Sequence, residues 1–173
     1  MSAIEGRDTA IAAARERRRR AAERYRPDEI DLLLVTEAPP SALDRYFYFE
    51  DVLTHDSLFR YVVRGVLGET PSRDKAPYLD ELRDRGVFLV DMSEDPFASR
   101  RDVLPGCVPG LVRRCSTLRP QRVVLIGAAT YDHAFDALRQ AGLPVVDIRL
   151  PYPGSGQQRR FLEGFQVALR VSD

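Results

Sequence analysis

The chain has 173 residues, 44% of them hydrophobic, and its 26 basic residues balance its 26 acidic ones. A chain of this length and composition can bury the core of one globular domain, which argues against wholesale disorder. The balanced charge by itself indicates no polyanionic partner.

The sequence carries no signal for a membrane or for a redox site. No apolar run approaches the roughly 20 residues that span a bilayer, and the N-terminus lacks the apolar segment and cleavage site of a secretory signal peptide. Two cysteines, Cys107 and Cys115, are too few for a disulfide scaffold or an iron–sulfur cluster. We therefore expect a cytoplasmic protein with reduced cysteines, no membrane partner, no cofactor and no metal.

The N-terminal segment combines helix-forming residues with concentrated positive charge. Residues 8–24 are rich in alanine and contain neither Gly nor Pro, which predicts a helix that Pro27 ends. The arginines of residues 15–26 could follow a phosphate backbone, or they could form the solvated face of the helix. We expect residues 1–27 to form this basic helix and residues 28–173 to form a single compact α/β domain.

Beyond this helix, short apolar runs alternate with longer helical segments. Residues 30–36 form an apolar run of strand length, typical of a buried parallel strand. Pro39 and Pro40 then force an irregular loop, and Gly86 separates a short helix from the next apolar run. The other predicted strands are 87–91, 122–126 and 144–148, and the other predicted helices are 56–67, 78–85, 109–118, 130–141 and 157–170.

This alternation predicts an α/β fold with three layers, α/β/α, around a central parallel sheet of four strands. Ligands of such sheets bind at the carboxyl ends of the strands. The predicted strand ends carry Glu37, Asp91, Gly127 and the loop at 150–153. A functional site is therefore expected where these ends meet.

Each strand end also carries a short motif. The motifs are Val35-Thr36-Glu37-Ala38-Pro39-Pro40, followed by the aromatic run Tyr46-Phe47-Tyr48-Phe49, then Val87-Phe88-Leu89-Val90-Asp91, Val123-Val124-Leu125-Ile126-Gly127 and Leu150-Pro151-Tyr152-Pro153-Gly154-Ser155. In order and spacing, over most of the chain, they resemble the motifs of the uracil-DNA glycosylase superfamily. The resemblance implies a uracil-DNA glycosylase-like fold and an enzyme that removes a damaged or modified base from DNA.

The resemblance also implies roles for individual residues. A stacked base must be swung into a pocket before its bond to the sugar can be cut. Glu37 is expected to stabilise the sugar cation or to orient the attacking water, unless it caps backbone amides of its loop. The rings of residues 46–49 are expected to divide between stacking on the base and the core.

The loop that follows Leu150 is expected to contact DNA, while Arg159 and Arg160 either hold phosphates or line the solvent face of the last helix. The predicted catalytic residues are Glu37 and Asp91, the base-binding residues are Ala38, Pro39, Tyr46, Phe47, Tyr48, Phe49 and Asp91, and the DNA-binding residues are Gly127, Pro151, Tyr152, Pro153, Gly154, Ser155, Gln157, Arg159 and Arg160.

Leu150 departs from the superfamily's pattern, because a histidine there usually stabilises the departing base. A site without it needs a better leaving group, a protonated base or another donor. Arg149, Tyr152, Ser155 and Gln157 are the candidate donors within the same loop. The four-cysteine cluster of some branches is absent as well.

Asp91 is the second departure, because the superfamily usually has asparagine there. An ionised carboxylate offers only acceptors, which suit the exocyclic amine of cytosine and would meet O4 of uracil with repulsion. If burial keeps Asp91 protonated, it can instead donate to cytosine N3. Both forms favour a cytosine-like base, and the alternative is that Asp91 caps the turn at 93–97.

The sequence thus predicts a monomeric DNA glycosylase without metal, with DNA as its partner and a modified cytosine as one candidate substrate. Members of the superfamily also serve in defence against phages with modified DNA, which leaves that role open beside DNA repair. Two alternatives remain. One is a non-catalytic nucleic-acid-binding relative, and the other is an enzyme of free nucleosides or nucleotides, since parallel α/β sheets host many activities.

Overall fold

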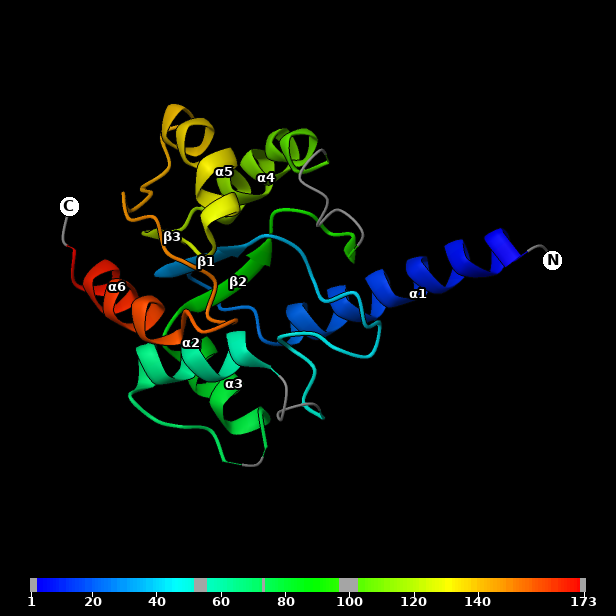
Figure 1. Cartoon of the computed structure of the whole chain (residues 1–173), viewed down its shortest axis with the longest axis horizontal. Coiled ribbons are helices and arrows are strands. Elements are labelled where there is room, and N and C mark those ends of the chain that lie inside the picture. Colours follow the sequence, from blue (N-terminus) through cyan, green and yellow to red (C-terminus); the bar gives the residue numbers. More distant parts are fainter. Residues whose placement is uncertain (1–2, 52–55, 73, 97–102, 172–173) are drawn as a thin grey trace.

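A computed structural model describes residues 3–51, 56–72, 74–96 and 103–171 (Figure 1). Its centre is an open parallel sheet with strand order β2-β1-β3. The strands are β1 (Leu32–Thr36), β2 (Val87–Asp91) and β3 (Val123–Leu125). The register places Thr36 beside Asp91 at the carboxyl ends of β1 and β2, so the two predicted strand ends meet as expected.

Six helices are present in the described residues, and they cover both faces of the sheet. In Figure 1, α4 and α5 lie on one side of the strands and α2, α3 and α6 lie on the other, while α1 extends well beyond the sheet. This arrangement confirms the α/β class. The helices are α1 (Ala3–Arg24), α2 (Ser57–Leu67), α3 (Ala76–Asp84), α4 (Leu104–Leu118), α5 (Ala128–Gln140) and α6 (Gln158–Arg170).

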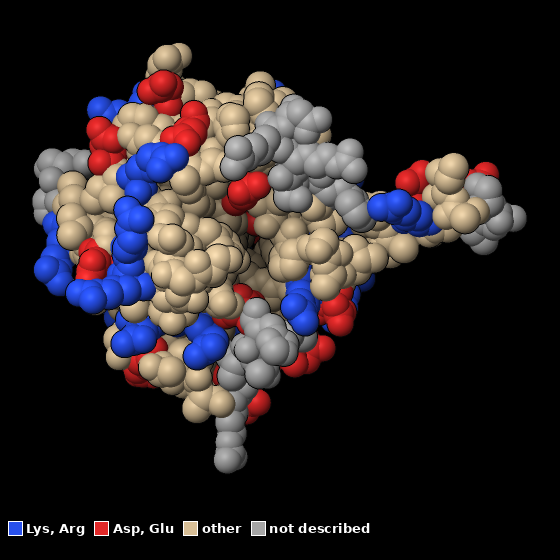
Figure 2. All heavy atoms as spheres, in the orientation of Figure 1, with Lys and Arg blue, Asp and Glu red and all other residues tan. Residues whose placement is uncertain are grey.

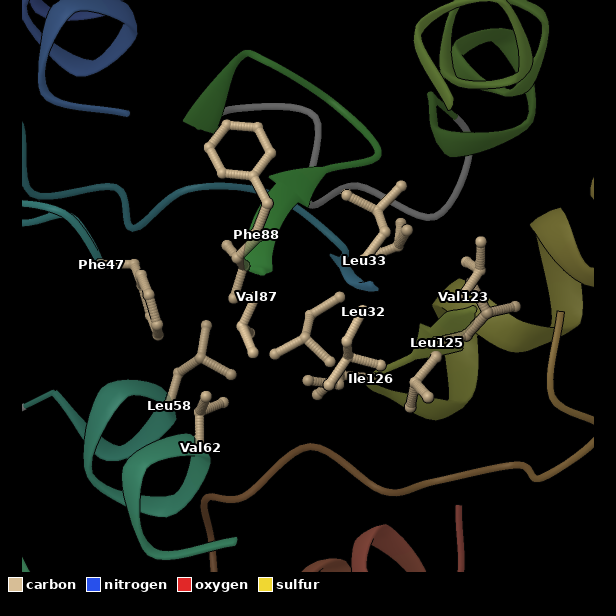
Figure 3. Close-up of a cluster of buried hydrophobic side chains, with 14 of the residues drawn as sticks. Leu32, Leu33, Phe47, Leu58, Val62, Val87, Phe88, Val123, Leu125 and Ile126 are labelled. Carbon is tan, nitrogen blue, oxygen red and sulfur yellow. The ribbon is translucent and has the colours of Figure 1, made fainter. Parts of the chain in front are cut away.

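The hydrophobic core surrounds the strands on both faces (Figure 3). Successive strand residues point to opposite faces of a sheet, and Leu33 and Leu34 of β1 are both fully buried. On the face of α2, the side chains of Leu58 and Val62 are buried against the core. The continuous apolar runs that predicted buried parallel strands therefore reflect cover on two sides.

The predicted fourth strand, at 144–148, is not formed. Val145 and Leu150 each make a single parallel bridge, to Val123 and Ile126 respectively. The two bridges are five residues apart on the 145–150 segment but only three residues apart on the 123–126 segment. A continuous ladder of paired residues therefore cannot connect them. The extra residues turn locally, with Val145 and Ile148 each donating a backbone N–H to the carbonyl two positions earlier.

Helix α4 begins at Leu104, five residues before the predicted start at 109. Pro105 occupies its first turn, and Pro109 lies inside the helix. Proline fits a first helical turn, where its missing N–H costs no intrahelical bond. Within the described residues, no helix combines the length and apolarity needed to cross a membrane.

Candidate functional site

A cavity of about 450 Å³ opens at the carboxyl ends of β1 and β2. Figure 2 shows the molecule hollowed near its centre, with acidic side chains beside the hollow. The cavity brings together loop residues after β1, the end of β2, the start of α2 and the loop after Leu150. The predicted site residues that line it are Glu37, Ala38, Pro39, Tyr46, Phe47, Asp91 and Tyr152.

The aromatic run divides between the cavity and the core. Tyr46 and Phe47 line the cavity. The hydroxyl of Tyr48 is buried and accepts the backbone N–H of Leu89 at 2.8 Å, which satisfies a donor of the edge strand β2. Phe49 is buried beneath the guanidinium of Arg17, 4.1 Å from its ring centroid. Tyr48 and Phe49 therefore belong to the core and do not line this cavity, so the predicted base contacts in the cavity are limited to Tyr46 and Phe47.

The loop after Leu150 lines a second cavity of about 430 Å³, which shares Tyr152 with the first. This second cavity is also lined by Ala128, the first residue of α5. The residue before it, Gly127, has a positive φ of 100°. The predicted DNA-binding residues that line the second cavity are Pro151, Tyr152, Gly154, Ser155, Gln157 and Arg160, together with Arg149. Pro153 and Arg159 do not line the described part of this cavity. Pro153 is buried, and Arg159 is exposed and paired with Glu163.

Leu150 is buried in the core and faces Gly164 of α6. A Cβ added to Gly164 would lie 2.6 Å from the Leu150 side chain, so the two elements approach closely. The position at which the resemblance implies a histidine therefore contributes packing here. Arg149, one candidate replacement donor, is held by Asp132 at 2.8 Å.

Glu37 has an available carboxylate. It follows β1 directly, and its backbone carbonyl accepts the N–H of Ser93 at 3.0 Å, which continues the pairing of β1 with β2. Its side chain is half-buried in the cavity wall. In the part of the chain that the structure describes, no backbone amide donates to this carboxylate, so it does not cap its loop. It is free to contact a ligand.

Asp91 is buried, with 8% of its surface exposed. Thr36 donates its hydroxyl to Asp91 Oδ1 at 2.5 Å. Burial raises the pKa of Asp91 to about 6, although the Thr36 hydrogen bond and the charges of Arg18 and Arg114 act in the opposite direction. Asp91 does not cap the turn that follows: the hydroxyl of Ser93 accepts the N–H of Asp95 there, and Phe97 lies outside the described residues.

Arg18 holds the loop after Glu37 from one side. Although it belongs to the arginine run, it is only 4% exposed. Its guanidinium donates to the backbone carbonyls of Pro40, Ala42 and Arg45, at 2.9 to 3.0 Å. The sequence analysis missed this role, although Ala14 and Arg18 are four residues apart and therefore share one buried helix face.

Lys75 holds the following segment of the same loop. Its ammonium is fully buried and donates to the carbonyls of Tyr46 and Phe47, at 3.1 and 3.0 Å. It also pairs with Asp56 at 2.7 Å, and Asp56 in turn caps the N-terminus of α2. Lys75 is the only lysine of the sequence. This was the one feature of the sequence that set Lys75 apart.

The remaining arginines of residues 15–26 are balanced by acidic neighbours. Each makes an ion pair: with Asp95 for Arg15, Asp51 for Arg17, Glu16 for Arg19 and Arg20, Glu50 for Arg24 and Glu23 for Arg26. This surface is thus largely neutralised, which favours the solvated-helix interpretation of the run. Among the residues placed by the structure, no group of three or more His, Cys, Asp or Glu side chains could hold a metal ion.

Comparisons with models of protein families and with curated proteins find no match for this chain. The interpretation of the cavity therefore depends on its residues and geometry.

Proposed function

We propose that the protein is a DNA glycosylase, which hydrolyses the N-glycosidic bond of a base swung out of DNA. One observation carries the proposal: the free carboxylate of Glu37 and the buried carboxylate of Asp91 line the same aromatic-walled cavity at the strand ends. A volume of about 450 Å³ lies within the range of small-molecule sites and is sufficient for a nucleobase.

Glu37 is the proposed catalytic carboxylate. Cleavage of the bond between base and sugar builds positive charge on the sugar, and a nearby carboxylate stabilises that charge or orients the attacking water. Glu37 suits this role because its carboxylate has no competing partner in the described residues. Arg18 and Lys75 hold carbonyls of the loop that follows Glu37, so we expect this loop to keep Glu37 in position during the reaction.

Asp91 is the proposed reader of the base. Its Oδ1 accepts from Thr36, so its other oxygen is left for a donor on the ligand. An exocyclic amine, as on cytosine, supplies such a donor. Tyr46 and Phe47 provide the apolar walls on which an extruded base can stack.

The second cavity is the proposed contact with the DNA backbone. Arg160, Gln157 and Ser155 offer donors beside the first turn of α6, and helix N-termini favour phosphate groups. Because Tyr152 lines both cavities, one strand could place its phosphate in the second cavity and its base in the first. One chain supplies all of these residues, so we expect activity from a monomer.

The test is a screen of purified protein on duplex and single-stranded oligonucleotides that each contain one modified base, with abasic sites as the product measured. The proposal expects abasic sites on at least one substrate and their loss in Glu37→Gln. Binding to DNA without any abasic product would identify a non-catalytic relative. Release of base from free nucleosides alone would identify an enzyme of nucleosides.

A further inference from the structure

The first cavity has an excess of negative charge. Its described lining includes three carboxylates, Glu37, Asp56 and Asp91, and one guanidinium, Arg45. Arg45 is exposed, so water screens its charge. Asp56 is neutralised by Lys75, but Glu37 has no cationic partner in the described residues. Asp91 is buried with one oxygen unpartnered among them, and the charges of Arg18 and Arg114 behind the wall offset part of its charge.

The effect of these charges reaches Tyr152, which lines the same cavity. Partial burial and the negative charges of Asp56, Asp91 and Glu37 raise the pKa of Tyr152 to about 12, although 47% of its surface is exposed. Glu37 and Asp91, which Lys75 does not neutralise, therefore both act on one point of the cavity wall. Clefts lined by one sign of charge concentrate ions of the opposite sign.

Aromatic side chains add to this preference. Tyr46, Phe47 and Tyr152 line the same cavity as the carboxylates. The faces of aromatic rings attract cations, and the attraction is stronger where water is excluded. An aromatic wall combined with acidic groups is the arrangement that suits a flat organic cation.

The chemistry of bond cleavage imposes the same requirement. A neutral base leaves as an anion and needs a donor or a positive charge beside it, yet Leu150, where the resemblance implies a histidine donor, is packed in the core. Carboxylates beside the leaving group would oppose its departure. A base that already carries a positive charge leaves as a neutral molecule and needs no donor.

We infer that this cavity selects a positively charged base, that is, a purine or pyrimidine of DNA alkylated on a ring nitrogen. The inference rests on the proposed glycosylase function and names its substrate class. The bond from sugar C1′ to the base nitrogen breaks, and its electron pair neutralises the ring. Water adds its oxygen to C1′ and gives a proton to the Glu37 carboxylate, which then releases it to solvent.

The first experiment measures charge selection without catalysis. Binding of 3-methylcytidine, which is cationic at pH 7, is compared with that of neutral cytidine by NMR titration of the whole protein. We expect the cation to bind at least about tenfold more tightly, because opposite charges attract strongly in a partly buried site. Asp91→Asn and Glu37→Gln should each reduce this ratio, whereas Glu69→Gln, which changes an exposed carboxylate outside the cavity, should leave it unchanged.

The second experiment measures excision from duplexes that contain 3-methylcytosine, 7-methylguanine, uracil, hypoxanthine or 5-hydroxymethylcytosine. The inference expects the two cationic bases to be released faster than the three neutral ones. Faster or equal release of a neutral base would overturn the inference and leave the glycosylase proposal intact. Selective binding of 3-methylcytidine without any excision would support charge selection and overturn the glycosylase. Equal binding of both nucleosides without excision would overturn both.

Discussion

Thr36 and Asp91 form a direct link between the ends of two neighbouring strands: the Thr36 hydroxyl donates to Asp91 Oδ1 at 2.5 Å. The two residues are partners in the register of β1 and β2. This pairing fixes the orientation of the Asp91 carboxylate and leaves its second oxygen for the cavity. The site is therefore built on the sheet itself, which positions side chains more rigidly than a loop would.

Replacement of Asp91 by asparagine should change how stability depends on pH. Burial raises the pKa of Asp91 from 3.8 to about 6, so the folded state binds this proton more tightly than the unfolded state. Proton binding to Asp91 therefore stabilises the folded wild type at low pH, and this stabilisation is lost as the pH rises from about 4 to about 6. Measured from pH 4 to pH 7, the stability of Asp91→Asn relative to the wild type should therefore increase by about 2 kcal/mol.

Urea unfolding at several pH values measures this difference, with Glu69→Gln as the control that removes an exposed carboxylate. A constant difference between wild type and Asp91→Asn from pH 4 to pH 7 would show that Asp91 does not titrate in this range.

The same substitution should also change the choice of base. An asparagine supplies one donor and one acceptor, which match uracil, and removes the negative charge that suits an amine or a cation. Sites built on buried hydrogen bonds discriminate strongly, because a mismatched ligand leaves polar groups unpaired. The ratio of 3-methylcytosine to uracil excision under single-turnover conditions should therefore fall in Asp91→Asn. An equal loss on all substrates would identify Asp91 as structural.

Lys75→Met should destabilise the protein strongly. The substitution leaves Asp56 and the carbonyls of Tyr46 and Phe47 without their donor in a buried position. Removing one partner of a buried ion pair typically costs about 3–5 kcal/mol. Thermal unfolding should show the loss, while Arg85→Met, which removes an exposed pair with Glu81, should leave the midpoint nearly unchanged. Similar midpoints for the two variants would contradict the role given to Lys75.

Arg160 and Arg159 offer a matched pair for testing contact with DNA. Arg160 lines the second cavity and has no carboxylate partner in the described residues, whereas Arg159 is paired with Glu163. If Arg160 contacts a phosphate, Arg160→Ala should reduce the slope of log affinity against log salt by about one. Arg159→Ala should change that slope less. Unchanged slopes in both variants would place the DNA backbone elsewhere.

The sequence predicted the parts of the fold that depend on local pattern. The predicted strands at 30–36, 87–91 and 122–126 are observed as Leu32–Thr36, Val87–Asp91 and Val123–Leu125. Glu37, just after the first strand, and Asp91, at the end of the second, line one cavity. The segment 144–148 has the composition of a strand, but strand formation also needs matched spacing between bridges to β3. That spacing is a property of the tertiary structure and leaves no local signal.

The buried cations could not be predicted for a related reason. Arg18 lies in a run of arginines whose other members are paired with acidic neighbours, and composition suggests that all of them face solvent. Its burial depends on three loop carbonyls that are 22 to 27 residues away in sequence. Lys75 depends on similarly distant carbonyls. Only the folded chain brings these partners together.

Single-turnover release of a base by wild type and Glu37→Gln, on duplexes containing 3-methylcytosine and 7-methylguanine, decides whether Glu37 is catalytic. We expect the wild type to produce abasic sites and Glu37→Gln to slow the chemical step by about 10²- to 10⁴-fold, with DNA affinity nearly unchanged. The Glu69→Gln control should match the wild type. Full activity of Glu37→Gln would rule out this role for Glu37, because the bond would then be cleaved without the carboxylate that has no partner among the described residues.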